Sequence, residues 1–358
     1  MRVIACCYFI DMKEIELTDR DRNIWVDYSK AIGIILVVYG HVARGIFNAG
    51  FRIDEGLYKL VDSIIYSFHM PLFFFLSGLF FFNSLTKRGI KGLLGSKIDS
   101  IIYPYLIWSI FQGVIEVYMS SHTNGYVNYS DVFSLLWQPR AQFWFLYALF
   151  MIFLVASILF NKVSEKFILP VFIGSILIYI FQQDIPSGLH INFISNNFVF
   201  FVFGMVLNKW ADVDIMSSKI WLFATFISFV FIQYIFHSVL SFSYVNKGTL
   251  SLIVALISIL FVVSLSKEMA KRPSNWFLFV GVSSMPIYLM HIIAASGSRI
   301  VLSNIFDVNS VIIHLLLGCV VGIGGSLIAV YLIKKYKLTF LLSLPISRLF
   351  QILKQKLI

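Results

Sequence analysis

Charged residues are scarce in this sequence, in which Asp, Glu, Lys and Arg together make up 13% of 358 residues. Soluble domains average about 25% charged residues. Because 59% of the residues are hydrophobic and 37 are phenylalanine, the chain is too apolar for a soluble protein with an ordinary core. The composition therefore indicates an integral membrane protein.

Cysteine is almost absent, since the chain contains only Cys6, Cys7 and Cys319. These spacings provide neither a disulfide framework nor a metal-ligand pattern, so we expect no bound metal. The sequence also lacks an internal repeat and a low-complexity linker. We therefore expect one membrane domain without a separate soluble domain.

Long apolar segments occur throughout the chain, and about 20 apolar residues suffice for a helix to span a membrane. Two of the segments, 166–182 and 249–266, are short and are candidates for tilted or partly re-entrant helices. The ten predicted spans are approximately 30–47, 60–82, 100–119, 143–160, 166–182, 193–209, 219–237, 249–266, 276–297 and 309–333.

Basic residues are distributed unevenly between the two sets of loops and tails. Of the 28 Lys and Arg residues, 22 fall on the side that holds both chain ends. The positive-inside rule therefore places both termini in the cytoplasm, and the same asymmetry explains much of the net charge of +10 without a nucleic-acid partner. We predict a cytoplasmic segment over 1–29, a membrane domain over 30–333 and a basic cytoplasmic tail over 334–358.

The first predicted span carries ionisable residues on one face. Lys30 and His41 are eleven residues apart, or about three helical turns, so they share one stripe. Asp27 and Arg44 each lie three residues from one of this pair and fall near the same stripe. An ionisable group at membrane depth costs roughly 2.5–3.5 kcal/mol on insertion scales. Their alignment therefore indicates a functional site.

Two further histidines are predicted at a depth similar to that of His41. His69 lies about 21 Å from the cytoplasmic end of the second span, and His291 lies about 22 Å into the ninth, at 1.5 Å per residue. These depths assume straight helices, although Pro71 and Pro286 are expected to make both helices locally irregular.

Each of these histidines taken alone is slightly more typical of a polar residue that bonds a neighbouring helix than of a functional site. Ser284, Tyr288 and His291 form one polar face, which fits either an interhelical hydrogen-bond seam or a site in which Tyr288 orients His291. Three histidines at matched depth with Lys30 favour a site. The remaining histidines are predicted to be structural or interfacial, namely His122, His190, His237 and His314.

The first basic loop contains Arg88, Lys91 and Lys97. These residues fit either contact with anionic lipids or a patch that binds the phosphates of a nucleotide-like cofactor. A neutral buried histidine is a plausible general base for a hydroxyl, and a nearby cation can hold an acyl donor or stabilise an oxyanion. Such residues also fit a proton-coupled carrier, and the residues alone do not separate the two classes.

Five motifs, in order along the chain, resemble those of the acyltransferase-three family of bacterial integral-membrane O-acetyltransferases, and in particular its fucose 4-O-acetylase-like branch. The resemblance extends from Arg22 to about Ile333. The motifs are a basic residue ten residues before a histidine (Lys30 to His41), Phe-His-Met-Pro-Leu-Phe-Phe-x-x-Ser-Gly (Phe68 to Gly78), a basic loop with Lys97 and Tyr103-Pro104-Tyr105, Trp-Phe-Leu (Trp144 to Leu146) and Tyr-Leu-x-His (Tyr288 to His291).

Two positions depart from the family pattern. The family often has arginine where this chain has Lys30, and lysine lacks the planar fork needed for bidentate binding. Many members have a histidine before Trp-Phe-Leu, where this chain has Gln142-Phe143. If that histidine binds the acceptor, the acceptor specificity of this chain differs.

The resemblance implies a multi-pass enzyme of the bacterial cytoplasmic (inner) membrane. It would transfer acetyl from acetyl-CoA, without a metal, to a hydroxyl of a cell-surface polysaccharide or its lipid-linked precursor. His41 would be the general base. The other implied roles are donor orientation by Lys30, completion of the site by His69, His291 and Tyr288, CoA binding by Arg88, Lys91 and Lys97, and substrate contact by Trp144, Arg44 and Asp27.

Two alternatives stay open at this point. One is a transporter or flippase for a sugar-linked lipid, although many carriers show an internal repeat that this chain lacks. The other is an O-acyltransferase that uses another acyl group, such as succinyl.

Overall fold

The computed structural model describes residues 23–120, 127–162, 164–185, 191–210 and 215–347. All regular secondary structure within these ranges is helical, as predicted for an all-α membrane protein. His122 and His190, together with the predicted terminal segments up to 22 and from 348, lie outside the described residues.

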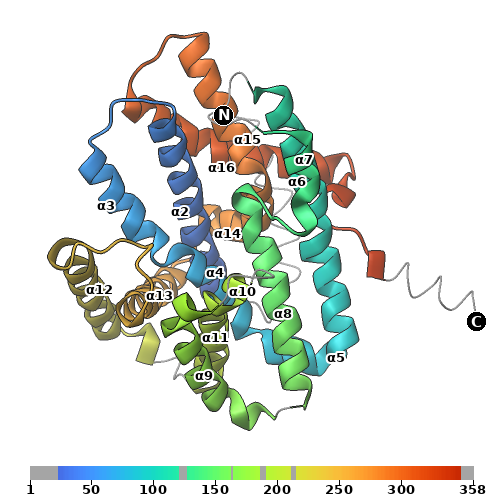
Figure 1. Ribbon diagram of the computed structural model, residues 1–358, viewed down its shortest axis with the longest axis vertical. Helices are drawn as coiled ribbons and strands as arrows, with labels where there is room; N and C mark the ends of the chain where they lie inside the picture. The colour runs from blue at the N-terminus through green and yellow to red at the C-terminus, as the bar shows by residue number, and fades with distance from the viewer. Residues whose placement is uncertain (1–22, 121–126, 163, 186–190, 211–214, 348–358) are drawn as a thin grey trace, which may run out of the picture.

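The described chain forms a bundle of long helices (Figure 1). Short helices α7 (Tyr129–Phe133) and α10 (Ile191–Ser195) lie between the longer ones. The longer helices are α2 (Ile24–Asn48), α3 (Glu55–Tyr66), α4 (His69–Leu79), α5 (Phe81–Lys97), α6 (Tyr103–Tyr118), α8 (Trp144–Lys162), α9 (Ile168–Ile180), α11 (Phe198–Trp210), α12 (Lys219–Tyr234), α13 (Thr249–Ala270), α14 (Asn275–Val282), α15 (Ser284–Asn304) and α16 (Val311–Lys335).

Nine helical segments of the described chain are long and apolar enough to cross a membrane, and they account for nine of the ten predicted spans. The tenth predicted span, 166–182, forms α9, which has only 13 residues. A helix of that length rises about 20 Å, which is less than the roughly 30 Å of a hydrocarbon core. By contrast, 249–266, also predicted to be short, extends into the 22-residue α13. The cytoplasmic placement of both termini stays a prediction from the charge distribution.

Two predicted spans are broken in the middle. Helices α3 and α4 meet at Ser67 and Phe68, and helices α14 and α15 meet at Ser283. Pro71 lies in the first turn of α4, and Pro286 lies in the first turn of α15. Proline lacks a backbone N–H, but residues in the first turn of a helix do not donate an intrahelical hydrogen bond, so no bond is lost. The predicted irregularity is therefore present, and it lies just before each proline.

Helix α2 runs through the centre of the bundle (Figure 1) and packs against α4, α13, α14, α15 and α16. Its apolar side chains Ile34, Val37 and Val38 are buried. Because neighbouring helices surround it, α2 presents Lys30 and His41 to cavities within the bundle; the Lys30 side chain is 37% exposed there.

Glycine allows α4 and α11 to pack with their backbones almost in contact. A Cβ atom added at Gly78 would lie 1.9 Å from the Phe201 carbonyl oxygen, and one added at Gly204 would lie 2.1 Å from the Phe75 carbonyl oxygen. Small residues at a helix crossing are the usual means of close packing in membranes. This crossing fixes α4, which begins with His69.

We expect Gly78→Ala to destabilise the protein because the new methyl group meets backbone atoms that cannot move aside. Overpacking of this kind typically costs about 1–3 kcal/mol, so the midpoint of thermal unfolding in detergent should fall clearly. Gly174→Ala is the matched control, because its Cβ would meet nothing within 4 Å. Equal midpoints for the two variants would contradict the tight crossing.

Candidate functional site

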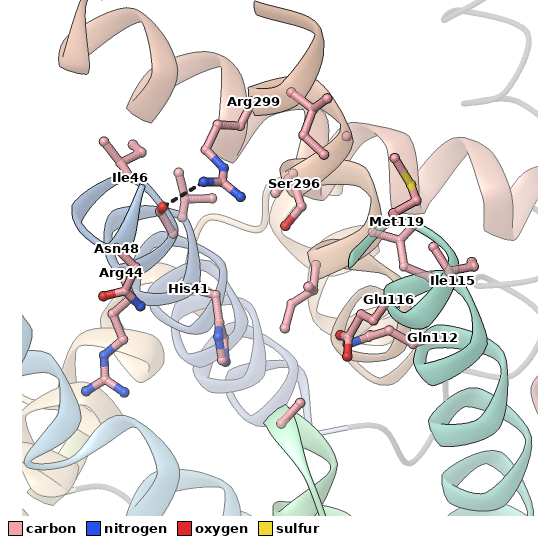
Figure 2. A pocket seen from close by; sticks show the side chains of 18 of the residues that line it. His41, Arg44, Ile46, Asn48, Gln112, Ile115, Glu116, Met119, Ser296 and Arg299 are labelled. Carbon is pink, nitrogen blue, oxygen red and sulfur yellow. Dashed lines mark hydrogen bonds between the residues drawn. The ribbon is translucent and has the colours of Figure 1, made fainter. Parts of the chain in front are cut away.

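Two cavities lie along α2. The larger, of about 590 Å³, is lined by residues from α2, α6 and α15, including His41, Arg44, Gln112, Glu116 and Arg299. We call it the His41 cavity; Figure 2 shows its lining. The smaller, of about 250 Å³, is lined by residues that include Lys30, Lys97 and Tyr288, and we call it the Lys97 cavity. Since Lys30 and His41 are about 16 Å apart along α2, the two cavities are at different depths.

His41 and His291 are in direct contact, with ring centroids 5.2 Å apart. His41 lines the larger cavity, whereas His291 is completely buried. The structure therefore joins two of the three histidines that were predicted at matched depth. This contact forms although the break at Ser283 means that α14 and α15 are not one straight helix.

The hydrogen bonds of His291 define its tautomer. Its Nδ1 lies 3.0 Å from the Ile287 carbonyl oxygen and 2.9 Å from that of Tyr288. Because carbonyl oxygens only accept hydrogen bonds, Nδ1 carries the proton and Nε2 holds a lone pair. That Nε2 is buried and has no hydrogen-bond partner among the described residues, so it can accept a proton or a hydrogen bond from a neighbour.

His69 begins α4, just after the break that follows α3. Its Nδ1 donates to the Ile65 carbonyl oxygen at 2.8 Å, across the break between α3 and α4, and its ring packs edge-on against Tyr66 at 4.4 Å. Tyr66 in turn packs against Gly40 of α2. His69 lies outside the lining of both cavities, and it joins the site through its contact with Tyr66 and through an electrostatic interaction with His41.

Arg44, predicted to bind substrate, lines the His41 cavity but is already bound by neighbours. Its Nε and Nη2 atoms donate to the two carboxylate oxygens of Asp62, both at 2.8 Å. Its guanidinium carbon lies 3.3 Å from the centre of the Tyr66 ring. Arg44 thus cross-links α2 to α3 and holds the ring that touches His69.

Lys30 and Lys97 come together at the Lys97 cavity. The Lys30 ammonium lies 3.4 Å from a carboxylate oxygen of Asp27, and the Lys97 ammonium lies 4.1 Å from the centre of the Phe153 ring. Asp27, predicted to contact substrate, is buried and lies outside both linings. In the structure its carboxylate contacts Lys30 instead.

The other predicted contact residues stand apart from the two cavities. Arg88 and Lys91 are exposed on α5, and Arg88 donates to the Ser96 hydroxyl at 2.7 Å. Trp144 stacks on Phe193 with ring centroids 5.9 Å apart. Of the three predicted CoA-binding cations, only Lys97 lines a cavity.

Tyr288 lies between the two cavities. It lines the Lys97 cavity, and its ring centroid is 6.2 Å from that of His291. Its hydroxyl donates to the backbone carbonyl of Gln142. The short segment from Arg140 to Phe143 therefore forms part of the boundary between the cavities, and Ala141 within it has a positive φ of 47°. Ala141–Phe143 forms a short 3-10 helix, and irregular backbone of this kind in a membrane protein is tolerated where protein or a cavity surrounds it.

Sequence reasoning missed a polar cluster on the wall of the His41 cavity. Gln112 and Gln142 exchange side-chain hydrogen bonds at 2.7 and 3.3 Å. Gln112 also donates to Glu116 at 2.7 Å, and Arg140 donates to the other oxygen of Glu116 at 2.5 Å. The available signal was the amide and carboxylate four residues apart on an otherwise apolar helix, which places both on one face.

The described residues contain no group of three or more His, Cys, Asp or Glu side chains arranged to hold a metal ion.

Comparison with known proteins identifies the class. Nodulation protein NolL of Mesorhizobium japonicum is 27% identical over 151 residues, which is 40% of this chain and 38% of the relative. Nodulation protein NolL of Sinorhizobium fredii is 26% identical over 147 residues, or 40% of this chain and 39% of the relative. These matches span about two fifths of the curated relatives, and no solved structure matches.

A family model described as an acyltransferase domain matches residues 23–331, which is most of the chain. This range contains both cavities and the histidine pair between them. The chain belongs to the acyltransferase-three family of membrane proteins.

Proposed function

We propose that the protein is a membrane-bound O-acetyltransferase that moves an acetyl group from cytoplasmic acetyl-CoA to a hydroxyl of a cell-surface polysaccharide or its lipid-linked precursor. The observation that carries the proposal is the contact between His41 and His291 at 5.2 Å. It brings a base on the wall of one cavity next to a histidine that Tyr288 connects to the other.

The Lys97 cavity suits the donor. The positive-inside rule places Lys30 and Lys97 toward the cytoplasm, where acetyl-CoA is found. A cavity of about 250 Å³ is below the usual range for sites that hold a whole drug-sized ligand. The acetyl thioester and part of its arm would enter, while the phosphates stay near the mouth with Lys97, and with Arg88 and Lys91 on the surface beyond.

The His41 cavity suits the acceptor, which would reach the histidine pair from the opposite side. His41 takes the proton of the acceptor hydroxyl as the oxygen attacks the thioester carbonyl carbon. A carbon–oxygen bond forms, the carbon–sulfur bond breaks, and the proton on His41 passes to the departing CoA thiolate. The lone pair on His291 Nε2 is available to stabilise the protonated His41 between these steps.

We expect His41→Ala to abolish release of free CoA thiol from acetyl-CoA while the protein still inserts and purifies as a monodisperse species. Loss of a general base typically costs about 10²–10⁴-fold in rate. The assay uses purified protein in detergent, acetyl-CoA and a membrane-glycan extract. His237→Ala is the control, because His237 lines neither cavity and should keep thiol release near the wild-type rate.

Wild-type thiol release by His41→Ala would contradict the catalytic assignment. Absence of thiol release by the wild type, together with glycolipid movement across a bilayer that needs no acetyl-CoA, would contradict the acyltransferase proposal as a whole.

We expect Lys97→Ala to raise the KM for acetyl-CoA by about tenfold, because it removes a charge-assisted contact to an anionic donor. Lys166→Ala is the matched control, since Lys166 is exposed in the short turn before α9 and lines neither cavity, and its KM should change less than about twofold. The measurement is the initial rate of thiol release against acetyl-CoA concentration. A larger change in Lys91→Ala than in Lys97→Ala would place the donor on the α5 surface instead.

A further inference from the structure

The polar cluster on α6 faces His41 across the larger cavity. Figure 2 shows Gln112 and Glu116 projecting from α6 toward the space that His41 borders on the opposite side. The Glu116 side chain is 22% exposed and that of its partner Arg140 is 18% exposed. The carboxylate is thus set into the cavity wall and still reachable from the cavity.

The hydrogen bonds of the cluster leave one group able to accept more. Gln112 uses its carbonyl oxygen for Gln142 and its amide nitrogen for both Glu116 and Gln142, so its bonding capacity is largely filled. Glu116 receives one described donor on each oxygen, whereas a carboxylate offers about four lone-pair directions. Glu116 therefore keeps acceptor capacity that points at the cavity.

Structural fixation alone accounts poorly for this arrangement. The Arg140–Glu116 pair does anchor the segment before α8, and Gly113 makes room for it, because a Cβ there would lie 2.8 Å from the Arg140 guanidinium. An anchor of this kind works equally well away from a cavity. An acid that borders a cavity, with lone pairs to spare, instead marks a place where a ligand can donate hydrogen bonds.

The remaining walls indicate the ligand class. Ile115, Met119, Ile292 and Ile293 line the same cavity, as do Arg44, which is bound to Asp62, and Arg299, which donates to the Gly45 carbonyl oxygen. A ligand therefore meets apolar side chains as well as the carboxylate. A sugar ring matches both, since it has C–H faces and several hydroxyl donors. A phosphate or carboxylate placed at Glu116 would face a like charge.

We propose that Glu116 is a specificity-determining residue that accepts a hydrogen bond from a second hydroxyl of the acceptor sugar while the reacting hydroxyl faces His41. Gln112 and Arg140 are positioning residues that hold the carboxylate. The acceptor is thus a ring with at least two hydroxyl groups that reach opposite walls of the cavity. This inference rests on the proposed acetyltransferase function.

The test compares the wild type with Glu116→Gln, which removes the charge at nearly constant shape. Initial rates are measured with acetyl-CoA and, as acceptors, the membrane-glycan extract at graded dilution and a set of methyl glycosides with their singly deoxygenated analogues. We expect the acceptor KM, or the half-saturating dilution of extract, to rise by about tenfold or more. The KM for acetyl-CoA should not change.

A deoxygenated glycoside provides the sharper readout. Removal of the hydroxyl that meets Glu116 should weaken the acceptor in the wild type and have little further effect in Glu116→Gln, because each change removes the same contact. Glu116→Asp keeps the negative charge that pairs with Arg140, so it controls for a folding defect caused by loss of that pair. It should also raise the acceptor KM. Glu55→Gln is the control, since Glu55 is exposed, paired with Lys59 and outside the cavity lining, and should match the wild type.

An unchanged acceptor KM in Glu116→Gln, or an equal rise in the KM for acceptor and for acetyl-CoA, would overturn the inference about Glu116. The acetyltransferase proposal would still stand in that case if the wild type shows glycan-dependent thiol release. Thiol release that no glycan stimulates, in any variant, would overturn the proposed function itself.

Discussion

The contact between His41 and His291 is the feature on which the rest of the site depends. Imidazoles at this depth are costly unless protein surrounds them, and the central position of α2 provides that surrounding. The contact also links the two cavities, because His41 borders one and Tyr288 connects His291 to the other.

Three interruptions of regular helix lie next to the site. The breaks before α4 and α15 come just before the helices that carry His69 and His291, and the segment from Arg140 to Phe143 accepts a hydrogen bond from Tyr288 at the Gln142 carbonyl oxygen. Backbone groups freed at such breaks need partners inside the protein. Two side chains of the site supply such partners. The His69 ring bonds the Ile65 carbonyl oxygen, and the Tyr288 hydroxyl donates to the Gln142 carbonyl oxygen. The polar side chains of the site thus also stabilise the irregular backbone that positions them.

Much of the fold followed from the sequence, because long apolar segments report membrane spans directly. The stripe of Lys30 and His41 was also predictable from helical periodicity, since it depends on one helix alone. The Arg140–Glu116 pair was not, because 24 residues separate its members and only tertiary packing brings them together. Lys97 lines a cavity whereas Arg88 and Lys91 are exposed. This difference likewise depends on how α5 packs, and the composition of the segment does not reveal it. For α9, the apolar composition predicted a membrane span at the correct position in the chain, but the helix that forms there is too short to cross the membrane.

We propose that donor and acceptor reach the histidine pair from opposite sides of the membrane. The most direct test reconstitutes the protein in sealed vesicles, adds labelled acetyl-CoA outside, and places the glycan acceptor either in the lumen or outside. The account predicts labelled glycan when the acceptor is in the lumen, with CoA thiol released outside, and no label in either place with His41→Ala. Labelling only when acetyl-CoA and glycan share one side would contradict it.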